Sequence, residues 1–284
     1  MTAAPRITVI GPAAWNHLIV VDELPQPRSQ MVAALDSWWT VGGTSAGKAL
    51  HLLDLGADVT LVTPVGDDDD GTRLRRALEA AGLTAVTVAA DATESHTNLM
   101  STSGERLSLY TSAPREATTD AVTAAIEASI AADVVVVDMS PLGRAALPAI
   151  AGLGVPVWTD LHDWNGADGY HRPFADAATV VTLNDDGGGD RDAIMEGLRA
   201  RGAHLVIRTL GAEGATALTA EGTRHQVPAD PVDAIVDTNG AGDAFTAGAL
   251  IASVRGAGPE ALLRSGATQA SRALGTRHLS PLLD

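Results

Sequence analysis

The amino-acid sequence predicts an α/β fold with a mainly parallel sheet and a small β lid. From Thr118 onward, apolar runs of strand length alternate with helix-forming segments, which is typical of βαβ units around a parallel sheet. Before Thr118 the chain carries additional strand patterns that fit a lid standing off this sheet. The 284 residues are 45% hydrophobic, which is sufficient for one large domain with a sizeable core. We therefore expect a single domain over residues 1–284, with lid strands inserted at about residues 18–41 and 97–111.

The N-terminal part of the chain mixes strands of the sheet and of the lid. Ile7–Ile10 is an apolar run that ends at Gly11-Pro12, so it predicts a buried first strand. After Gly42-Gly43, apolar residues at helical spacing predict a helix that ends at Gly56. The remaining patterns predict lid strands at Leu18–Val21, Met31–Leu35, Trp38–Val41, Thr97–Thr102 and Leu107–Thr111, a sheet strand at Val59–Val62 and a helix at Thr72–Ala81.

The C-terminal part of the chain follows the alternating pattern. Strands are predicted at Val134–Val137, Val155–Thr159, Val180–Leu183 and Leu205–Ile207. A hairpin-like stretch follows, Ala215–Thr219 with Thr223–Val227. Helices are predicted at Asp120–Ala131, Gly143–Ala151, Arg191–Arg201, about Gly240–Val254, and Pro259–Leu274.

The composition excludes several classes of function. The formal net charge is -16, from 35 acidic and 19 basic residues, so nucleic-acid binding, which needs clustered Lys and Arg, is not expected. The chain has no cysteine, which excludes disulfides and thiolate chemistry. We find no signal-peptide pattern and no apolar run of membrane-spanning length, and we expect a cytoplasmic protein that binds no membrane.

The stretch DTNGAGDAF, from Asp237 to Phe245, carries the strongest functional signal. Its small residues Gly240-Ala241-Gly242 open a segment that continues as a helix. Such a helix start leaves backbone N–H groups unpaired, and the helix dipole adds partial positive charge there. Both features favour an anion site suited to a phosphate. Asp243 lies in the first turn and is a candidate general base for a hydroxyl that attacks the phosphate.

The complete nonapeptide resembles the signature of the ribokinase-like, or phosphofructokinase-B type, carbohydrate kinases. The resemblance covers almost the whole chain and implies a three-layer α/β/α domain. It also implies transfer of the ATP γ-phosphate to a hydroxyl of a small sugar or sugar derivative, with ATP and Mg²⁺ as cofactors. In that reaction Asp243 would accept the hydroxyl proton, and the amides of Gly240, Ala241 and Gly242 would hold the developing negative charge.

Several positions correspond to the substrate-binding elements of this family. The pair Gly42-Gly43 would let the backbone approach a small ligand, although a simple strand-to-helix turn explains it equally well. The family usually has Asp at position 16 and Asn at position 47, where this chain has Asn16 and Gly47. Asn16 still donates and accepts hydrogen bonds, so we expect these positions and Asp243 to bind the substrate. Lys48 would face an anionic group of the substrate, with a solvated helix face as the simpler interpretation.

The same stretch also matches the P-loop of a different class of nucleotide-binding proteins, up to its final position. Residues Gly42 to Lys48 fit that pattern, but the next residue should be Ser or Thr to hold magnesium and is Ala49. A P-loop normally follows the first strand of the sheet, whereas this stretch follows lid-like strands. The sequence therefore favours the carbohydrate-kinase interpretation.

Two stretches fit the nucleotide side of the kinase family. The turn from Thr209 to Gly214, with glycines at 211 and 214, resembles its ATP-binding turn, in which Gly211 and Gly214 would let the backbone approach the phosphates and ribose. Asn184 follows a predicted strand, as in the family's Asn-x-x-Glu element near magnesium, but the Glu position is Gly187. Magnesium takes few protein carboxylates, so we expect metal use without assigning its ligands, although Asp185 and Asp186 are close by.

Other ions and partners are less constrained by the sequence. Some family members bind a monovalent cation such as K⁺, which would lie near Asp237 and Asn239 here. The acidic run Asp67–Asp70 is expected to be a solvated loop. The adjacent Trp38 and Trp39 should point to opposite faces of a lid strand, so one of them is available to a partner in a homodimer formed through the lid.

Two alternative functions stay open. One is a nucleoside kinase of the same fold, with Trp15 as a stacking surface for the base. The other is a non-catalytic sugar-binding regulatory protein, which the changed substrate positions allow and the intact motif around Asp243 disfavours.

Overall fold

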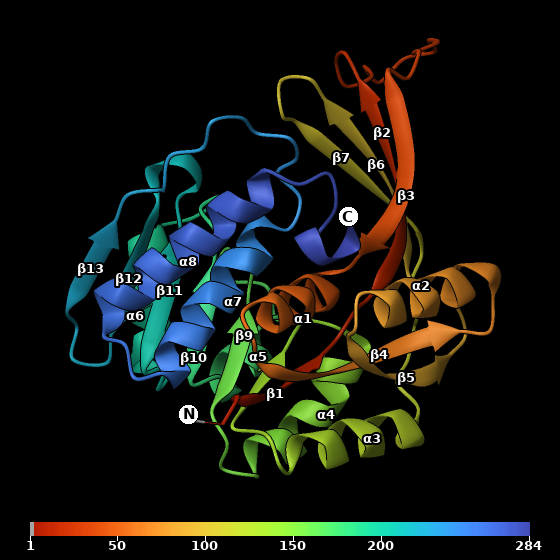
Figure 1. Ribbon diagram of the computed structural model, residues 1–284. Helices are drawn as coiled ribbons and strands as arrows, with labels where there is room; N and C mark the ends of the chain where they lie inside the picture. Colours follow the sequence, from red (N-terminus) through yellow and green to blue (C-terminus); the bar gives the residue numbers. More distant parts are fainter. Residues whose placement is uncertain (1–2) are drawn as a thin grey trace.

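The computed structural model describes residues 3–284 and contains a large and a small β-sheet (Figure 1). Within these residues the large sheet has nine strands in the order β13-β12-β11-β10-β9-β8-β1-β4-β5. Neighbours run parallel from β11 to β5, whereas β12 and β13 pair antiparallel. The strands are β1 (Arg6–Ile10), β4 (Asp58–Gly66), β5 (Thr84–Ala90), β8 (Val134–Val137), β9 (Val157–Asp160), β10 (Val180–Leu183), β11 (Leu205–Thr209), β12 (Ala215–Thr219) and β13 (Arg224–Val227).

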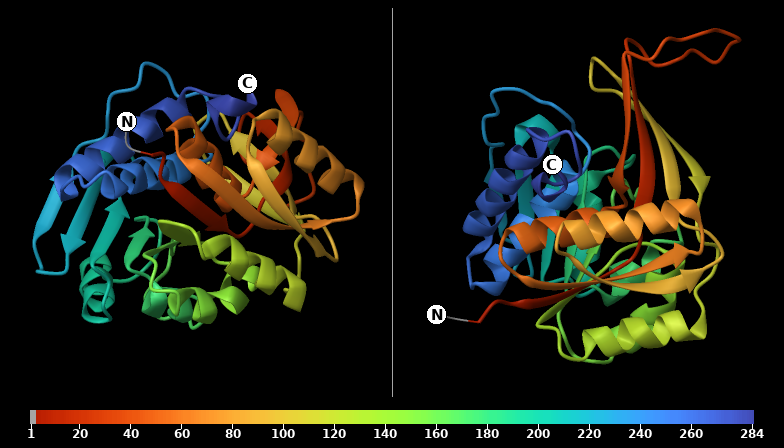
Figure 2. Two further views of the ribbon diagram at one scale, coloured as in Figure 1. Left: turned by 60° about the horizontal axis from the view of Figure 1, so that its bottom comes forward. Right: turned by 45° about the vertical axis from the view of Figure 1, so that its right-hand side comes forward.

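Helices cover both faces of this sheet, which confirms the predicted three-layer α/β/α fold (Figure 2). A hydrophobic cluster lies on each face of the sheet. The central strands are therefore buried on both sides, which explains why their sequences are continuous apolar runs. One face carries α1 (Thr44–Asp54), α2 (Asp69–Ala80), α7 (Ala241–Val254) and α8 (Pro259–Leu274). The other face carries α3 (Thr119–Ser129), α4 (Pro141–Ala151), α5 (Arg172–Ala177) and α6 (Arg191–Ala200).

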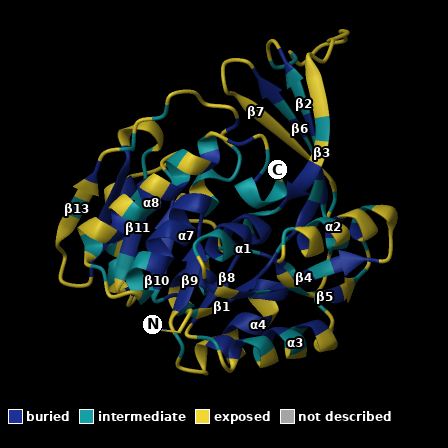
Figure 3. Cartoon of the chain, in the orientation of Figure 1, coloured by how far each residue is buried: buried dark blue, intermediate teal, exposed yellow. Residues whose placement is uncertain are grey.

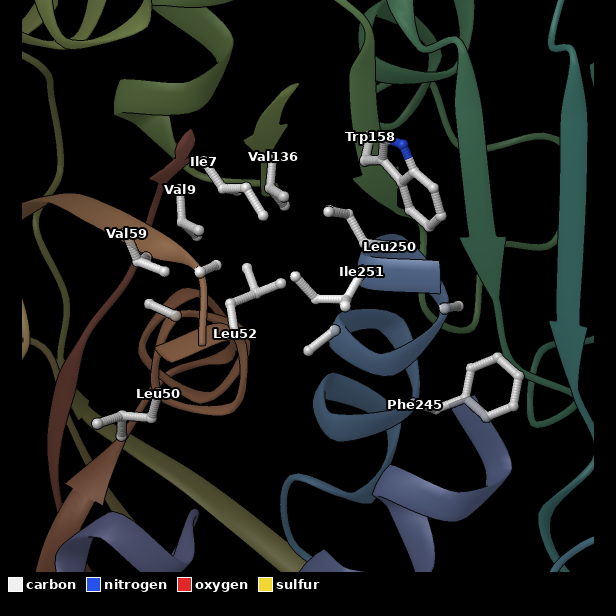
Figure 4. Close-up of a cluster of buried hydrophobic side chains, with 14 of the residues drawn as sticks. Ile7, Val9, Leu50, Leu52, Val59, Val136, Trp158, Phe245, Leu250 and Ile251 are labelled. Atoms are coloured by element: carbon white, nitrogen blue, oxygen red, sulfur yellow. The ribbon is translucent and has the colours of Figure 1, made fainter. Parts of the chain in front are cut away.

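Helix α7 lies at the centre of the first of these layers. Figure 4 shows Leu250 and Ile251 of this helix pointing toward Ile7, Val136 and Trp158 of the sheet. All residues from Ala244 to Ile251 are buried, because α1, α8 and the sheet enclose the helix on different sides. The first turn of α7 is therefore held in place by a helix that cannot shift without disturbing the core.

The small sheet forms the predicted lid, with the strand order β3-β2-β6-β7. In Figure 2 these strands rise from the body of the molecule, and Figure 3 shows exposed residues at their outer end. β2 pairs antiparallel with β3 and parallel with β6, so the lid is more than two simple hairpins. The strands are β2 (Ala14–Val21), β3 (Asp36–Gly42), β6 (Ser95–Ser101) and β7 (Arg106–Ser112).

Two local predictions need correction. The strand expected at Met31–Leu35 is wrong, since these residues belong to an exposed connection at the tip of the lid and β3 begins only at Asp36. Met31 is 101% exposed, so its apolar side chain has no core to pack against. The run Asp67–Asp70 is not only a solvated loop, because the Asp68 carboxylate caps α2 by accepting a hydrogen bond from the Gly71 amide at 2.7 Å. The helix consequently begins at Asp69, three residues earlier than predicted.

The architecture brings three sets of residues to one edge of the large sheet. They are the carboxyl ends of the parallel strands, the first turns of α1 and α7, and the base of the lid. Open α/β sheets bind their ligands at this edge. In residues 3–284 we also find no helix that is both long and apolar enough to cross a membrane.

Candidate active site

A cleft of about 1060 Å³ lies between the lid and the carboxyl edge of the large sheet. The lid contributes polar side chains from its four strands, and the sheet contributes residues at the ends of β9, β10 and β11 and just after them. The turn before α7 forms part of the same wall. The residues that the argument below uses are Asn16, His96, Tyr110, Asp160, His162, Asn184, Thr209 and the segment Asp237–Asp243, all of which line the cleft.

The turn that opens α7 has the geometry of an anion site. Gly240 precedes the helix in the left-handed conformation, with φ of 77°, and no side chain caps the first turn. This positive φ favours glycine, and a side chain at position 240 would also crowd the end of the Leu279 side chain at 2.6 Å. The Asp237 carboxylate accepts a hydrogen bond from the Asn239 amide at 2.9 Å and so fixes the preceding loop. The first turn of α7 thus has no side-chain cap and lines the cleft, and the Ala241 amide donates a long hydrogen bond, 3.5 Å, to the Thr238 carbonyl that a bound anion would replace.

The Asp243 carboxylate is oriented by α1. Its Oδ1 accepts hydrogen bonds from the Thr44 hydroxyl at 2.5 Å and from the Lys48 ammonium at 2.9 Å. On the other side, a methyl group added to Gly47 would lie 2.7 Å from Asp243 Oδ2. The absence of a side chain at Gly47 therefore leaves the space that this carboxylate occupies. With Oδ1 engaged twice, Oδ2 is the oxygen that remains for a substrate hydroxyl.

Lys48 lies at the centre of a buried cluster of charges. Its ammonium is within 3.1 Å of Asp138 Oδ1, 3.4 Å of Asp160 Oδ2 and 2.9 Å of Asp243 Oδ1. Burial by itself would lower the pKa of Lys48, but the carboxylates of Asp138, Asp243 and Asp160 outweigh that effect and raise it. Lys48 is therefore a permanent cation at this point.

The two carboxylates deeper in the cluster differ from each other. Burial raises the pKa of Asp138, although Lys48 and a 2.6 Å hydrogen bond from the Ser45 hydroxyl oppose this. Burial acts in the same direction on Asp160, but His162, Lys48 and the amide of His162 together lower its pKa. Asp160 is thus the carboxylate that stays charged, and it also faces the cleft.

These contacts correct two predictions about Lys48. The solvated helix face is wrong, since the Lys48 side chain is only 1% exposed. The contacts agree with the rejection of a P-loop, because the stretch follows β3 of the lid and the ammonium is enclosed by carboxylates. For the same reason Lys48 is not open to an anionic group of a substrate in the cleft.

The other predicted substrate positions lie at the base of the lid. Asn16 on β2 lines the cleft, and its Oδ1 accepts a hydrogen bond from the His96 amide at 3.2 Å. Gly42 packs directly against Asn16, where an added methyl group would meet the amide nitrogen at 2.0 Å. Gly43, with φ of 89°, turns the chain from β3 into α1. A methyl group added to Gly43 would lie 2.5 Å from the Pro12 carbonyl oxygen. Gly47 contacts Asp243 rather than the cleft itself.

The predicted nucleotide-binding residues line the opposite end of the cleft. Thr209 ends β11, and the turn after it contains Gly211 with φ of 56° and Gly214 with φ of 96°. A side chain at Gly214 would lie 2.1 Å from the Val227 carbonyl, so the close approach of β13 requires glycine. Asn184 follows β10, and its Oδ1 accepts a hydrogen bond from the Asp186 amide at 3.0 Å. The structure thus gathers Asn184, Thr209, Gly211 and Gly214 at one end of the cleft.

Position 187 has a structural reason for lacking glutamate. A methyl group on Gly187 would lie 2.0 Å from the Asp163 carbonyl oxygen and 2.6 Å from the guanidinium of Arg191. Arg191 is itself buried and donates a hydrogen bond to the Trp164 carbonyl at 2.6 Å. Asp185 and Asp186 nevertheless line the cleft beside Asn184. These oxygen donors suit Mg²⁺, which keeps most of its waters and binds through one or two carboxylates and the nucleotide phosphates.

Sequence reasoning missed Asp138 and did not assign a role to Asp160 or to the hydroxyl of Thr44. A signal was present, since each aspartate is the first acidic residue after an apolar strand, in VVVVD and in VWTD. Parallel strands that are neighbours bring such residues together at one edge of the sheet. Thr44 opens α1 directly after its N-cap, Gly43, and no local pattern marks its hydroxyl as a partner of Asp243.

Comparison with known proteins agrees with this geometry. Residues 4–282 match the model of the pfkB family of carbohydrate kinases. The chain is 35% identical over 275 residues to the acarbose 7(IV)-phosphotransferase of Actinoplanes sp. strain SE50/110, covering 94% of this chain and 91% of that protein. It is 26% identical over 272 residues to the nucleoside kinase of Methanothermobacter thermautotrophicus, covering 88% and 83%.

The solved structures show the same relationship. A microbiome-derived acarbose kinase superimposes with a TM-score of 0.86 and 28% sequence identity, covering 96% of this chain and 94% of that one. The family model matches nearly the whole chain, and the turn before α7 with the carboxylate beside it fits that match. The chain belongs to the pfkB family of carbohydrate kinases, which are ATP-dependent phosphotransferases.

Proposed function

We propose that this kinase transfers the ATP γ-phosphate to a hydroxyl of an acarbose-type substrate, a sugar-derived molecule of several linked rings, with Asp243 as the general base. The observation that carries the proposal is the position of Asp243. Asp243 lines the cleft in the first turn of α7, which no side chain caps, so a hydroxyl and a phosphate can meet there. The names of two relatives that match over nearly the whole chain support the choice of substrate class.

The reaction assigns one task to each wall of the cleft. The substrate hydroxyl donates its proton to Asp243 Oδ2 while its oxygen attacks the γ-phosphorus, and the bond to the bridging oxygen of ATP breaks to release ADP. The amides of Gly240, Ala241 and Gly242 stabilise the charge that develops on the transferred group. ATP lies along Thr209, Gly211 and Gly214, with its phosphates directed toward α7.

Two cations assist in this scheme. Mg²⁺ would be held by Asn184, Asp185 or Asp186, largely through water, and would neutralise the nucleotide phosphates. A monovalent cation such as K⁺ would lie near Asp237 and Asn239. The support for this site is the charge of the Asp237 carboxylate, which accepts hydrogen bonds from the Asn239 side-chain amide at 2.9 and 3.1 Å.

The inner face of the lid supports a substrate larger than one sugar ring. His96 and Tyr110 lie side by side on β6 and β7 with ring centroids 3.9 Å apart, and both line the cleft. Tyr110 is 70% exposed, so its ring is open to a ligand. Asn16 accepts a hydrogen bond from the His96 amide and packs against Gly42, at the base of the lid. We assign it to the substrate ring that carries the reacting hydroxyl. A second ring of the substrate would then contact Tyr110.

A nucleoside substrate has less support. Trp15, the expected stacking surface, packs against the hydrophobic core beneath the lid and does not line the cleft. Side chains alternate along β2, so Asn16 faces the cleft and its neighbour cannot. The non-catalytic alternative is likewise disfavoured, because every group of the anion turn and Asp243 itself are present.

We also propose that a second copy of the chain covers the outer face of the lid. Trp39, His17, Thr97 and Leu109 lie opposite one another across four strands, and His17 and Trp39 stack with ring centroids 4.4 Å apart. Trp39 and Leu109 are about half exposed on this face. An apolar, open-edged sheet of this kind needs covering. Trp38 points the other way, as expected, and lies under the guanidinium of Arg277 at 4.0 Å.

The role of Asp243 leads to the first prediction. Asp243→Asn keeps the shape and removes the base, so kcat should fall by about 10²–10⁴-fold. ATP affinity should stay within about threefold, because the backbone amides remain. Steady-state kinetics with acarbose and MgATP, together with ATP titration of the variant, measure both. Asp67→Asn, in the exposed loop before α2, is the matched control; a kcat above about a tenth of wild type in Asp243→Asn would contradict the assignment.

The second prediction concerns substrate size. Tyr110→Ala should raise KM for acarbose about tenfold, the equivalent of about 1.4 kcal/mol, and change KM for monosaccharides less than about twofold. Tyr110→Phe keeps the ring and should behave as wild type. The measurement is KM for acarbose and for a panel of pentoses and hexoses with all three proteins. An equal rise for large and small substrates would show that Tyr110 acts only through the shape of the lid.

The third prediction concerns assembly. Sedimentation velocity should give a species of twice the chain mass of 29.0 kDa, and Leu109→Asp should convert it to the monomer. Ile130→Asp, which places the same charge at another exposed apolar residue, should leave the dimer intact. A wild-type protein that sediments as a monomer at high concentration would rule out the lid dimer.

A further inference from the structure

The inner face of the lid carries side chains in rows that cross its strands. Asn16 of β2 and His96 of β6 belong to the row at the base of the lid. In the next row, Asn98 of β6 lies between Leu18 of β2 and Ser108 of β7. All five residues line the cleft, so this second row also faces a bound molecule.

The side chain of Asn98 differs from that of Asn16 in its hydrogen bonding. Asn16 Oδ1 accepts a hydrogen bond from the His96 amide at 3.2 Å. Asn98 is only 5% exposed, and its buried Oδ1 accepts no hydrogen bond from any group in residues 3–284. A buried amide oxygen without a donor is costly and uncommon in folded proteins. Because Asn98 lines the cleft, a molecule bound there can supply the donor.

The position of Asn98 along β6 places it above the reacting end of the cleft. One row further from the base, the Arg106 guanidinium donates a hydrogen bond to Asn239 Oδ1 at 2.6 Å. The Asn239 amide nitrogen also lies 3.6 Å from the sulfur of Met100, the residue of β6 that pairs with Arg106. Asn98 therefore lies between the row of Asn16 and the point where the lid touches the turn before α7.

The chemistry of a carboxamide selects what can pair with it. Its oxygen accepts hydrogen bonds and its nitrogen donates two, so two neighbouring hydroxyls of a sugar ring, one donating and one accepting, match it. An ionised carboxylate or a phosphate dianion only accepts, and it would leave Asn98 Oδ1 unpaired. A site that buries such a group favours the ligand that satisfies it and rejects one that does not.

We propose that Asn98 is a specificity-determining residue of the lid, whose carboxamide binds a pair of hydroxyls on the substrate ring that carries the reacting hydroxyl. The inference rests on the proposed function, because the ligand is the sugar-derived acceptor of the phosphate. It adds a contact that the base of the lid does not provide, since the acceptor oxygen of Asn16 is already engaged within the protein. It also explains why an asparagine is buried between Leu18 and Ser108 without a partner in the protein.

The experiment measures binding without turnover, by calorimetric titration of wild type, Asn98→Leu and Asn98→Ala with acarbose and, separately, with MgATP. Both variants remove the carboxamide, and only leucine keeps a branched side chain in its place. Kd for acarbose should rise about tenfold or more in both variants, because a buried hydrogen-bond partner is lost. Kd for MgATP should stay within about twofold, since Asn98 is remote from the predicted nucleotide-binding turn, Thr209 to Gly214.

Thermal unfolding without ligands distinguishes this role from a structural one. Asn98→Leu removes no hydrogen bond within residues 3–284, so its unfolding midpoint should not fall below that of wild type. Ser101→Ala on the same strand is the matched control. Ser101 is also buried, but its hydroxyl accepts a hydrogen bond from the Glu105 amide at 2.9 Å. Ser101→Ala should therefore lower the midpoint and leave Kd for acarbose unchanged, the opposite of Asn98→Leu.

The outcomes separate this inference from the proposed function. If wild type binds acarbose and both Asn98 variants bind it equally well, the role of Asn98 is overturned and the proposed function stands. A loss in Asn98→Leu that Asn98→Ala does not share is steric and overturns the inference as well. If wild type neither binds nor phosphorylates acarbose, the proposed substrate class fails, and the same variants titrated with the best acceptor among pentoses and hexoses decide the role of Asn98. A weakened acarbose complex in both variants, with MgATP binding intact, supports the inference whether or not Asp243 is the base.

Discussion

Lys48 is buried where α1, β8, β9 and α7 meet. Its ammonium lies within 3.4 Å of three carboxylates: Asp138 after β8, Asp160 at the end of β9, and Asp243 of α7. Removing one partner from such a buried set leaves uncompensated charge and typically costs about 3–5 kcal/mol. The arrangement of the site therefore depends on all four elements being in register. The same contact that satisfies the lysine also orients Asp243, so the stability of this junction and the geometry of the reaction have a common origin.

Two positions without side chains make that junction possible. Gly47 leaves room for the Asp243 carboxylate, and Gly240 turns the chain into α7 while passing close to Leu279. The lid is attached to the same region, because Arg106 of β7 donates a hydrogen bond to Asn239 Oδ1 at 2.6 Å, in the turn before α7. A ligand that moves the lid would thus act on the loop that precedes the anion-binding amides.

Much of this structure follows from the sequence, for reasons that particular residues illustrate. The apolar run Val134–Val137 is buried on both faces, and the fold class was predictable because such runs alternate with helices. The anion turn was predictable because Gly240 to Asp243 are contiguous and their chemistry is local. Lys48 was misjudged because its partners Asp138, Asp160 and Asp243 are distant in sequence and only the topology of the sheet brings them together. The strand expected at Met31–Leu35 failed for a related reason, since local β propensity cannot reveal that no neighbouring strand is there.

The central claim is that close packing of α1 against the first turn of α7 places the base, and Gly47→Ala tests it most directly. Alanine favours a helix by about 1 kcal/mol over glycine, but the added methyl group must displace Asp243 from its place beside Lys48. Gly197→Ala in α6, where an added methyl group meets nothing within 4 Å, is the matched control. The account predicts a kcat at least about tenfold below wild type for folded Gly47→Ala, about 1.4 kcal/mol in the barrier, with KM for ATP unaffected. A Gly47→Ala protein that turns over at the wild-type rate would contradict it.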